Sequence, residues 1–213
     1  MKKYSIPISN ENIDMFFKPL RKKTDIIILL MNTIKYVISY VNVSTRTNSS
    51  IDIIIDDMNR FIYKSENKIF SIRSPFSIRE DEGKLIFYSK NIPEITSTIS
   101  SKIIAFSNDY RFNSSSWGGF IELLDELFTD ADSVWLLIQE LMLFEDGYLR
   151  YDHDPEHESG RIHPLYHLDI YYTTASTFKI GTYHKPCPFY FTELLNTKKN
   201  EKTTLNIRLI SIT

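Results

Sequence analysis

The sequence predicts a single α+β domain, 1–213, in which a long core helix packs on an antiparallel sheet and further helices precede a C-terminal strand region. Three observations predict it. The apolar run Ile26–Val43 is long enough for a buried helix. Five short runs rich in β-branched and aromatic residues follow, with no helical period between them. A chain of 213 residues with 42% hydrophobic content can bury one sizeable core.

The N-terminal elements are predicted from capping signals. The polar residues Ser9–Asn12 lead into a short helix, Ile13–Phe17, that stops before a proline. Thr24 or Asp25 is placed to cap the long helix. Polar residues interrupt its apolar run, and a lysine lies near its middle, so we interpret it as a core helix and not as a membrane span.

The middle of the chain predicts an antiparallel meander. Turn residues occupy Ser65–Asn67 and Glu80–Gly83, where hairpins are expected. The predicted strands are Ile51–Asp56, Arg60–Lys64, Lys68–Arg73, Lys84–Ser89 and Lys102–Phe106.

Two helical segments are predicted next. Ser114–Ser116 caps a helix from Trp117, and Val134–Phe144 is nearly all apolar and therefore buried. Asp146-Gly147 has two interpretations, a glycine that ends this helix or a hairpin turn before Tyr148–Asp154. Leu205–Ile212 is expected to be a last strand. The helical and meander part, 1–147, thus precedes a histidine-bearing part, 148–213.

Composition excludes some function classes and leaves others open. No Gly-rich phosphate loop of the GxxxxGK[ST] or GxGxxG type occurs. The lone cysteine, Cys187, lies between prolines, which favours a structural turn over a catalytic thiol. With no disulfide and no signal peptide predicted, a cytoplasmic location is expected. The segment Glu122–Glu158 holds twelve acids and one base, whereas the first 35 residues hold seven bases and three acids. Either the two faces dock within one domain, or a basic flank binds an anionic polymer while an acidic pocket holds a cation.

The candidate site is indicated by the histidines. All five lie between His153 and His184, interleaved with carboxylates. If 163–172 is a strand, alternate residues place His163, His167 and Asp169 on one face. A second strand, Tyr148–Asp154, would add Asp152 and Asp154. The sequence therefore predicts that these residues converge.

Imidazole and carboxylate together suit Zn²⁺, Mn²⁺ or Fe²⁺, which leads us to expect a divalent metal held by Asp152, Asp154, His163, His167 and Asp169. A bound metal would generate a hydroxide nucleophile, and Lys179 would hold a phosphate group. A metal-free pair, with His163 and His167 as base and acid and Lys179 as the anion clamp, would suffice to cleave RNA. A third interpretation is structural, with both histidines satisfied by carboxylates and tyrosines on a polar sheet face.

Arg150-Tyr151-Asp152, His163-Pro164-x-x-His167-Leu168 and the following Pro188–Phe191 pattern resemble the C-terminal part of an uncharacterised bacterial domain-of-unknown-function family. The resemblance implies an accessory protein of mobile, defence-related gene clusters and names no reaction.

Two function hypotheses result. The first is a phosphodiester-cleaving hydrolase, nuclease-like, that acts on nucleic acid as a bacterial toxin or antiviral-defence effector. The alternative is a non-catalytic interaction or adaptor subunit of a multi-protein defence system, whose acidic segment docks on a protein partner encoded nearby.

Overall fold

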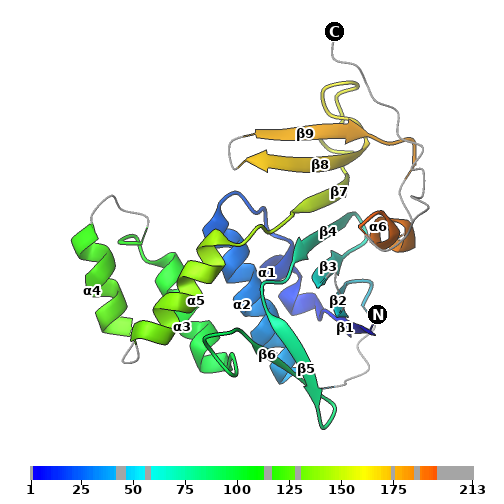
Figure 1. The fold of residues 1–213 in the computed structure, drawn as a ribbon. Helices are drawn as coiled ribbons and strands as arrows, with labels where there is room; N and C mark the ends of the chain where they lie inside the picture. The colour runs from blue at the N-terminus through cyan, green and yellow to red at the C-terminus, as the bar shows by residue number, and fades with distance from the viewer. Residues whose placement is uncertain are drawn as a thin grey trace. The chain divides into compact units, whose positions relative to one another are not determined.

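The computed structural model describes residues 2–41, 47–55, 59–112, 117–127, 131–173, 176–184 and 188–195. Their contacts group the chain into two compact units, each assembled from separate stretches. The sheet unit comprises Met1–Ile13, Thr45–Arg73 and Gly147–Thr213, and the helical unit comprises Asp14–Ser44 and Ser74–Asp146. The predicted α+β class with an antiparallel sheet is confirmed (Figure 1). The single domain stays a prediction.

The sheet unit is built on a seven-stranded antiparallel meander in the order β1-β2-β3-β4-β7-β8-β9. Every strand pairs with the next one in this order. Between β4 and β7 the chain passes through the helical unit. The strands are β1 (Lys2–Pro7), β2 (Ser50–Ile55), β3 (Arg60–Lys64), β4 (Lys68–Arg73), β7 (Leu149–His153), β8 (Tyr166–Thr173) and β9 (Ser176–Gly181).

One face of this sheet carries a hydrophobic core. Phe191 of helix α6 (Pro188–Leu194) packs there with buried side chains from β2, β3, β4, β7 and β8. Burial of each such large apolar side chain stabilises the fold by about 1.5–3 kcal/mol. Because alternate residues of a strand face opposite sides, this core leaves the intervening residues for the other face. The strand residues of this core are Ile54, Ile62, Ile69, Tyr151 and Leu168.

The other face changes character across the sheet. Residues directly opposite one another in neighbouring antiparallel strands share a face. One such row begins with the buried aromatic residues Tyr63 and Phe70, whose rings stack 4.5 Å apart, and continues through Arg150, Asp169 and Lys179. This row is therefore apolar over β3 and β4 and charged over β7, β8 and β9.

The helical unit has α2 (Lys23–Ser39) at its centre. It packs against α3 (Ser97–Asn108), against α5 (Ala131–Leu143) and against β6 (Lys84–Tyr88), which forms a hairpin with β5 (Ser77–Asp81). The unit also contains α4 (Trp117–Leu127) and most of α1 (Ile13–Phe17), which follows a short 3₁₀ turn, η1 (Asn10–Asn12). Among the described residues, no helix is long and apolar enough to cross a membrane.

The structure corrects the start of the long helix. Its N-cap is Lys22, and neither Thr24 nor Asp25 is the cap. The Asp25 carboxylate instead accepts hydrogen bonds from the backbone N–H groups of Arg21 and Lys22, at 2.8 and 2.9 Å. A carboxylate in the first turn can reach the free N–H groups before it, so Asp25 stabilises the helix start from inside the helix.

The predicted strand Lys102–Phe106 is wrong, because these residues lie in α3. Thr96 accepts a hydrogen bond from the backbone N–H of Ile99 and so begins the helix six residues before Lys102. Ile103 and Phe106 are buried with helical spacing. In the sequence they belong to a short continuous apolar run, which periodicity alone cannot assign to a strand or to a helix.

Other boundaries also differ. The strand expected from residue 163 begins at Tyr166, and β1 and β5 were not predicted. Gly147 is neither a helix-ending glycine nor a hairpin turn, because α5 ends at Leu143 and β7 pairs with β4 and β8. The strand predicted there, Tyr148–Asp154, is confirmed as β7. The Ser114–Ser116 cap, Cys187 and the strand Leu205–Ile212 lie outside the described residues.

Candidate metal centre

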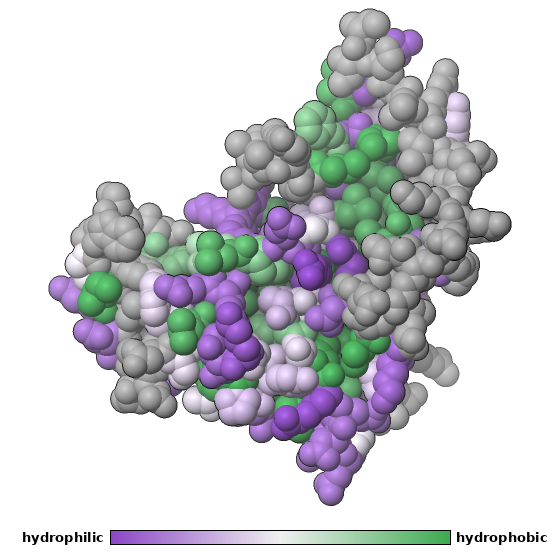
Figure 2. Space-filling model, in the orientation of Figure 1, coloured by the Kyte–Doolittle hydropathy of each residue, from purple (hydrophilic) through white to green (hydrophobic). Residues whose placement is uncertain are grey.

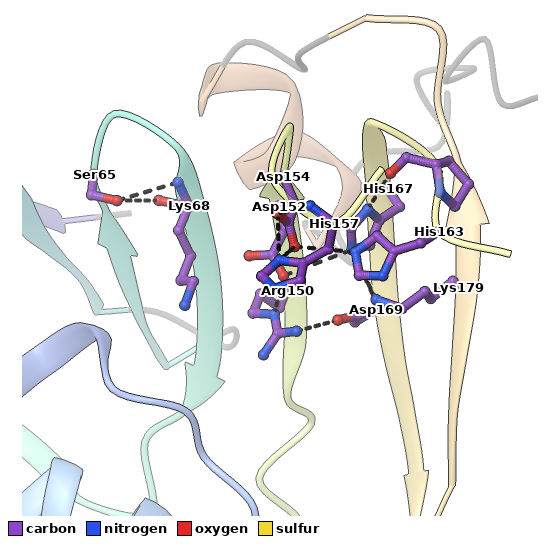
Figure 3. A network of polar contacts seen from close by, with 11 residues as sticks. Ser65, Lys68, Arg150, Asp152, Asp154, His157, His163, His167, Asp169 and Lys179 are labelled. Carbon is purple, nitrogen blue, oxygen red and sulfur yellow. Dashed lines mark hydrogen bonds and ion pairs between the residues drawn. The ribbon is translucent and has the colours of Figure 1, made fainter. Parts of the chain in front are cut away.

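The candidate site lies on the charged face of the sheet, where two neighbouring rows meet (Figure 3). One row joins Arg150 to Asp169 and Lys179, and the next joins Asp152 to His167. The rows come from β7, β8 and β9, which are consecutive strands, so short connections and antiparallel register are enough to assemble them. The predicted pairing of these two strands is confirmed, and of the five residues expected to converge it brings Asp152, His167 and Asp169 together.

His167 is the most buried member of the group, with no exposed side-chain surface. Its Nδ1 lies 2.7 Å from the carbonyl oxygen of Pro164. Because a carbonyl only accepts, Nδ1 carries the proton and Nε2 presents a lone pair. Burial lowers the pKa of His167; the bond to Pro164 opposes this shift, and the positive charge of Lys179 adds to it. The imidazole is therefore neutral near neutral pH, the form that binds a metal.

Two carboxylates face this nitrogen. Oδ2 of Asp152 lies 3.8 Å from Nε2 of His167, and Oδ1 of Asp169 lies 3.9 Å from it. The two aspartate side chains are 13% and 3% exposed. The second oxygen of Asp152, Oδ1, is buried and has no hydrogen-bond partner among the described residues. Each of the three residues offers a ligand atom within 4.8 Å of the others, so the group could hold a metal ion.

The donor set fits a first-row divalent metal. Imidazole and carboxylate are the usual ligands of Zn²⁺, Mn²⁺ and Fe²⁺. A ligating histidine commonly donates its other N–H to a backbone carbonyl, as His167 does to Pro164. Bond lengths of about 2.0–2.2 Å place tetrahedral ligand atoms roughly 3.3–3.6 Å apart. The observed separations of 3.8 and 3.9 Å need only a small side-chain adjustment.

Two cations already balance the carboxylates. Arg150 pairs with both, through Nε at 2.6 Å from Oδ2 of Asp152 and through Nη2 to Asp169. The Lys179 ammonium lies 2.9 Å from Oδ1 of Asp169 and 2.9 Å from Nε2 of His167. It thus contacts two candidate ligand atoms at once. A divalent cation at this group would have to displace the ammonium, whose side chain is 28% exposed.

Lys68 is a cation of this site that sequence reasoning missed. It stands opposite Asp152 in the pairing of β4 with β7. Burial lowers the pKa of the Lys68 ammonium, and Asp152 opposes that shift more strongly than Asp154 and Asp169 do. The sequence places Lys68 at the start of a predicted strand, 84 residues before Asp152. Only the register between β4 and β7 brings the two residues together.

The remaining predicted ligands form a separate contact. His163 lies outside β8, in a turn that bridges to Ser159, so the prediction of one strand face shared with His167 is wrong. A proline follows His163 and delays the strand. Nε2 of His163 instead lies 3.1 Å from Oδ2 of Asp154. The rings of His163 and His167 still meet edge to face, 4.7 Å apart between centroids.

The other three histidines are His153, His157 and His184, and none of them belongs to the group around His167. Nδ1 of His157 lies 3.0 Å from Oδ1 of Asp154. His153 stacks on the Tyr166 ring with centroids 4.9 Å apart, and His184 is exposed beside Tyr183.

No family model, no curated protein and no solved structure matches this chain. The resemblance to a bacterial domain-of-unknown-function family stays a prediction.

Proposed function

We propose that the protein is a metal-dependent hydrolase of phosphodiester bonds, nuclease-like, with Asp152, His167 and Asp169 as the metal ligands. The observation that carries the proposal is the neutral, buried His167, whose Nε2 lies within 4 Å of two carboxylates. Zn²⁺, Mn²⁺ and Fe²⁺ are the metals that this donor set favours. A bound metal of this kind lowers the pKa of its water to about 7 and supplies a hydroxide nucleophile at neutral pH.

The cations of the same sheet face support an anionic substrate. Lys68, Arg150 and Lys179 come from three strands and lie around the ligand group. A metal held by Asp169 and His167 would take the two atoms that the ammonium of Lys179 now contacts. The ammonium would then be available to bind a phosphate oxygen and to stabilise the charge that develops during cleavage. Arg150 would keep the carboxylates oriented.

Burial favours this assignment over the metal-free histidine pair. A general base must come within about 3.2 Å of the proton that it removes. The His167 side chain has no exposed surface, and its Nδ1 is engaged by Pro164. A ligand can act from such a position because the metal, and not the imidazole, meets the substrate. The Lys179 and Asp152 side chains keep some exposure, 28% and 13%, so solvent reaches part of the group.

The test combines metal analysis with cleavage assays. Protein without a histidine tag is stripped with a chelator, reloaded with Zn²⁺ or Mn²⁺, and incubated with labelled single- and double-stranded RNA and DNA. Asp169→Asn keeps the shape of the side chain but removes a ligand charge, and we expect it to lose both metal and cleavage. His184→Ala, at an exposed histidine, is the matched control and should keep both.

The outcomes separate the alternatives. Metal-dependent cleavage that Asp169→Asn abolishes supports the proposal. Cleavage that persists without metal and is lost in His163→Ala would instead support the acid–base pair. A folded wild type that binds no divalent metal and cleaves none of the substrates would overturn both.

A second candidate function is the non-catalytic interaction subunit, and the helical unit provides the observation that favours it. Leu136 and Leu143, one heptad apart on α5, are 42% and 82% exposed, and Ile121 on α4 is 50% exposed. Figure 2 shows hydrophobic residues among hydrophilic ones on the surface of this unit. In light scattering of the protein mixed with a partner encoded nearby, the double variant Leu136→Ser/Leu143→Ser should reduce the association seen with the wild type. Unchanged association would count against this function.

A further inference from the structure

A lysine lies on each side of the proposed metal group. Lys68 comes from β4, next to Asp152, and Lys179 comes from β9, next to His167 and Asp169. In Figure 3 the side chains of Lys68 and Lys179 stand at opposite ends of the network, with the candidate metal ligands between them. The two lysines therefore flank the place where a scissile phosphate would lie.

The order of the strands keeps the two lysines apart. Neighbouring strands lie about 4.8 Å apart, so the three intervals from β4 through β7 and β8 to β9 span about 14 Å. The Lys179 ammonium is turned toward the ligand group, 2.9 Å from both Nε2 of His167 and Oδ1 of Asp169. A phosphate held there lies over β8 and β9, whereas β4 is two intervals from β8. Lys68 is thus placed for a different part of the same substrate.

The cation between the two lysines is already engaged. Arg150 pairs with both Asp152 and Asp169, and its side chain is only 15% exposed. Lys68 is half-buried, and its charge is attracted to that of Asp152. Because an ammonium group has three donors, Lys68 can keep this attraction and still donate a hydrogen bond to a phosphate oxygen.

We infer that Lys68 binds the phosphate next to the scissile one, so that the substrate is a polynucleotide whose strand crosses the sheet from β9 to β4. The inference rests on the proposed function and names its substrate class. A small diester has only the scissile phosphate and leaves Lys68 without a substrate contact. The competing explanation is structural: Lys68 only neutralises Asp152 and tunes metal binding. In that case a variant of Lys68 affects every substrate alike.

The experiment compares two substrates of different length. One is a labelled single-stranded oligonucleotide, and the other is bis(p-nitrophenyl) phosphate, which has one phosphate. We would measure kcat and KM with the full, untagged chain loaded with Zn²⁺ or Mn²⁺. The variants are Lys68→Met, Lys68→Arg and Lys179→Met, with Lys84→Met, at an exposed lysine of β6, as the matched control. Metal content and circular dichroism are recorded for each variant.

We expect Lys68→Met to raise the KM for the oligonucleotide about tenfold, the effect of one lost hydrogen bond between charged groups. The change on the small diester should be much smaller. Lys68→Arg should restore the oligonucleotide KM, because it keeps the charge. Lys179→Met should lower kcat on both substrates, because both contain the scissile phosphate. The slope of log KM for the oligonucleotide against log salt concentration should fall by about one in Lys68→Met.

Equal losses on the two substrates in Lys68→Met would assign the lysine to Asp152 and overturn the inference, while the proposed function stands. Unchanged kinetics in this variant, or cleavage of the small diester alone by the wild type, would overturn it as well. If the wild type cleaves only the oligonucleotide, an unchanged salt slope in Lys68→Met overturns the inference. A metal-loaded wild type that cleaves neither substrate would overturn the proposed function and the inference together.

Discussion

The ammonium of Lys179 lies 2.9 Å from Nε2 of His167, where it contacts the atom through which this histidine would bind a metal. The same ammonium contacts Oδ1 of Asp169. A lysine and a divalent cation therefore compete for the same two atoms.

Lys179→Met should strengthen metal binding and weaken catalysis. The substitution removes a positive charge from the ligand group and leaves a side chain of similar length. We expect the Kd for Zn²⁺ to fall by about tenfold, which corresponds to about 1.4 kcal/mol, while cleavage falls because the phosphate contact is lost. Calorimetry against a chelator of known affinity measures the first effect. Lys84→Met, at an exposed lysine of β6, is the control, and weaker metal binding in Lys179→Met would contradict the competition.

Arg150→Met should destabilise the protein unless metal is present. Arg150 pairs with Asp152 and Asp169, and its side chain is 15% exposed. Removing one partner of a buried ion pair costs about 3–5 kcal/mol, because the other charge stays buried. Zn²⁺ would neutralise the same carboxylates, so thermal unfolding should show a larger rise in Tm on adding Zn²⁺ for this variant than for the wild type. Equal shifts would argue against metal at this group, and Arg161→Met, at an exposed arginine, is the control.

Because of the buried carboxylate of Asp52, we expect the free energy of unfolding to fall in acid, independently of the metal centre. Its carboxylate is fully buried and contacts Ser5 at 2.8 Å, Lys3 at 2.8 Å, and Lys64. Burial raises the pKa of Asp52, but the hydrogen bonds from Lys3, Lys64 and Ser5 together outweigh burial and hold that pKa below its ordinary value. A carboxylate whose pKa is lower in the folded state stabilises the fold fully above the unfolded pKa of about 3.9. That contribution is lost as the pH falls through the folded pKa.

Asp52→Asn removes this carboxylate from the titration. Urea unfolding between pH 3 and pH 7 should show a shallower acid loss for the variant, with a lower stability at neutral pH by about 1–3 kcal/mol. Asp125→Asn, at an exposed aspartate of α4, should reproduce the wild-type curve. A variant with the same pH dependence as the wild type would show that Asp52 contributes nothing to it.

Gly147→Ala and Gly160→Ala form a matched pair. Both glycines have φ of +53°, a conformation that costs an L-residue about 1–2 kcal/mol. A Cβ at Gly160 would meet no atom within 4 Å. A Cβ at Gly147 would lie 3.2 Å from Nη1 of Arg60. Arg60 also donates a hydrogen bond from Nη2 to the carbonyl oxygen of Gly147. We expect Gly147→Ala to lower the free energy of unfolding more than Gly160→Ala does. Chemical denaturation measures both, and equal losses would exclude a contribution from Arg60.

The fold class followed from the sequence where local signals were strong. Alternating apolar residues and short polar turns predicted β2, β3, β4 and β6 with nearly correct bounds. The strand–helix confusion at Lys102–Phe106 arose because the continuous apolar run Ile103–Phe106 shows no period that would separate a strand from a helix. β1 was missed because a sheet edge needs little apolar sequence and depends on a partner, β2, 43 residues away in the chain.

The site was predictable in part. Period-two alternation placed Asp152 on one face of its strand, and placed His167 and Asp169 together on one face of theirs, so the three metal-ligand candidates could be named before their distances were known. His163 was assigned to the wrong element, because the sequence does not show that the strand begins only at Tyr166. Lys68 was missed because its role depends on strand pairing across an 84-residue gap.

The sequence by itself determined which residue types are available and how they alternate along each strand. Alternation is a local property of the backbone, so it can be inferred for one strand without knowing which strands pair with it. Only the tertiary structure decided which rows meet, that Lys179 contacts His167 and Asp169, and that Arg150 spans both carboxylates. These contacts depend on register and burial, which the whole sheet sets at once.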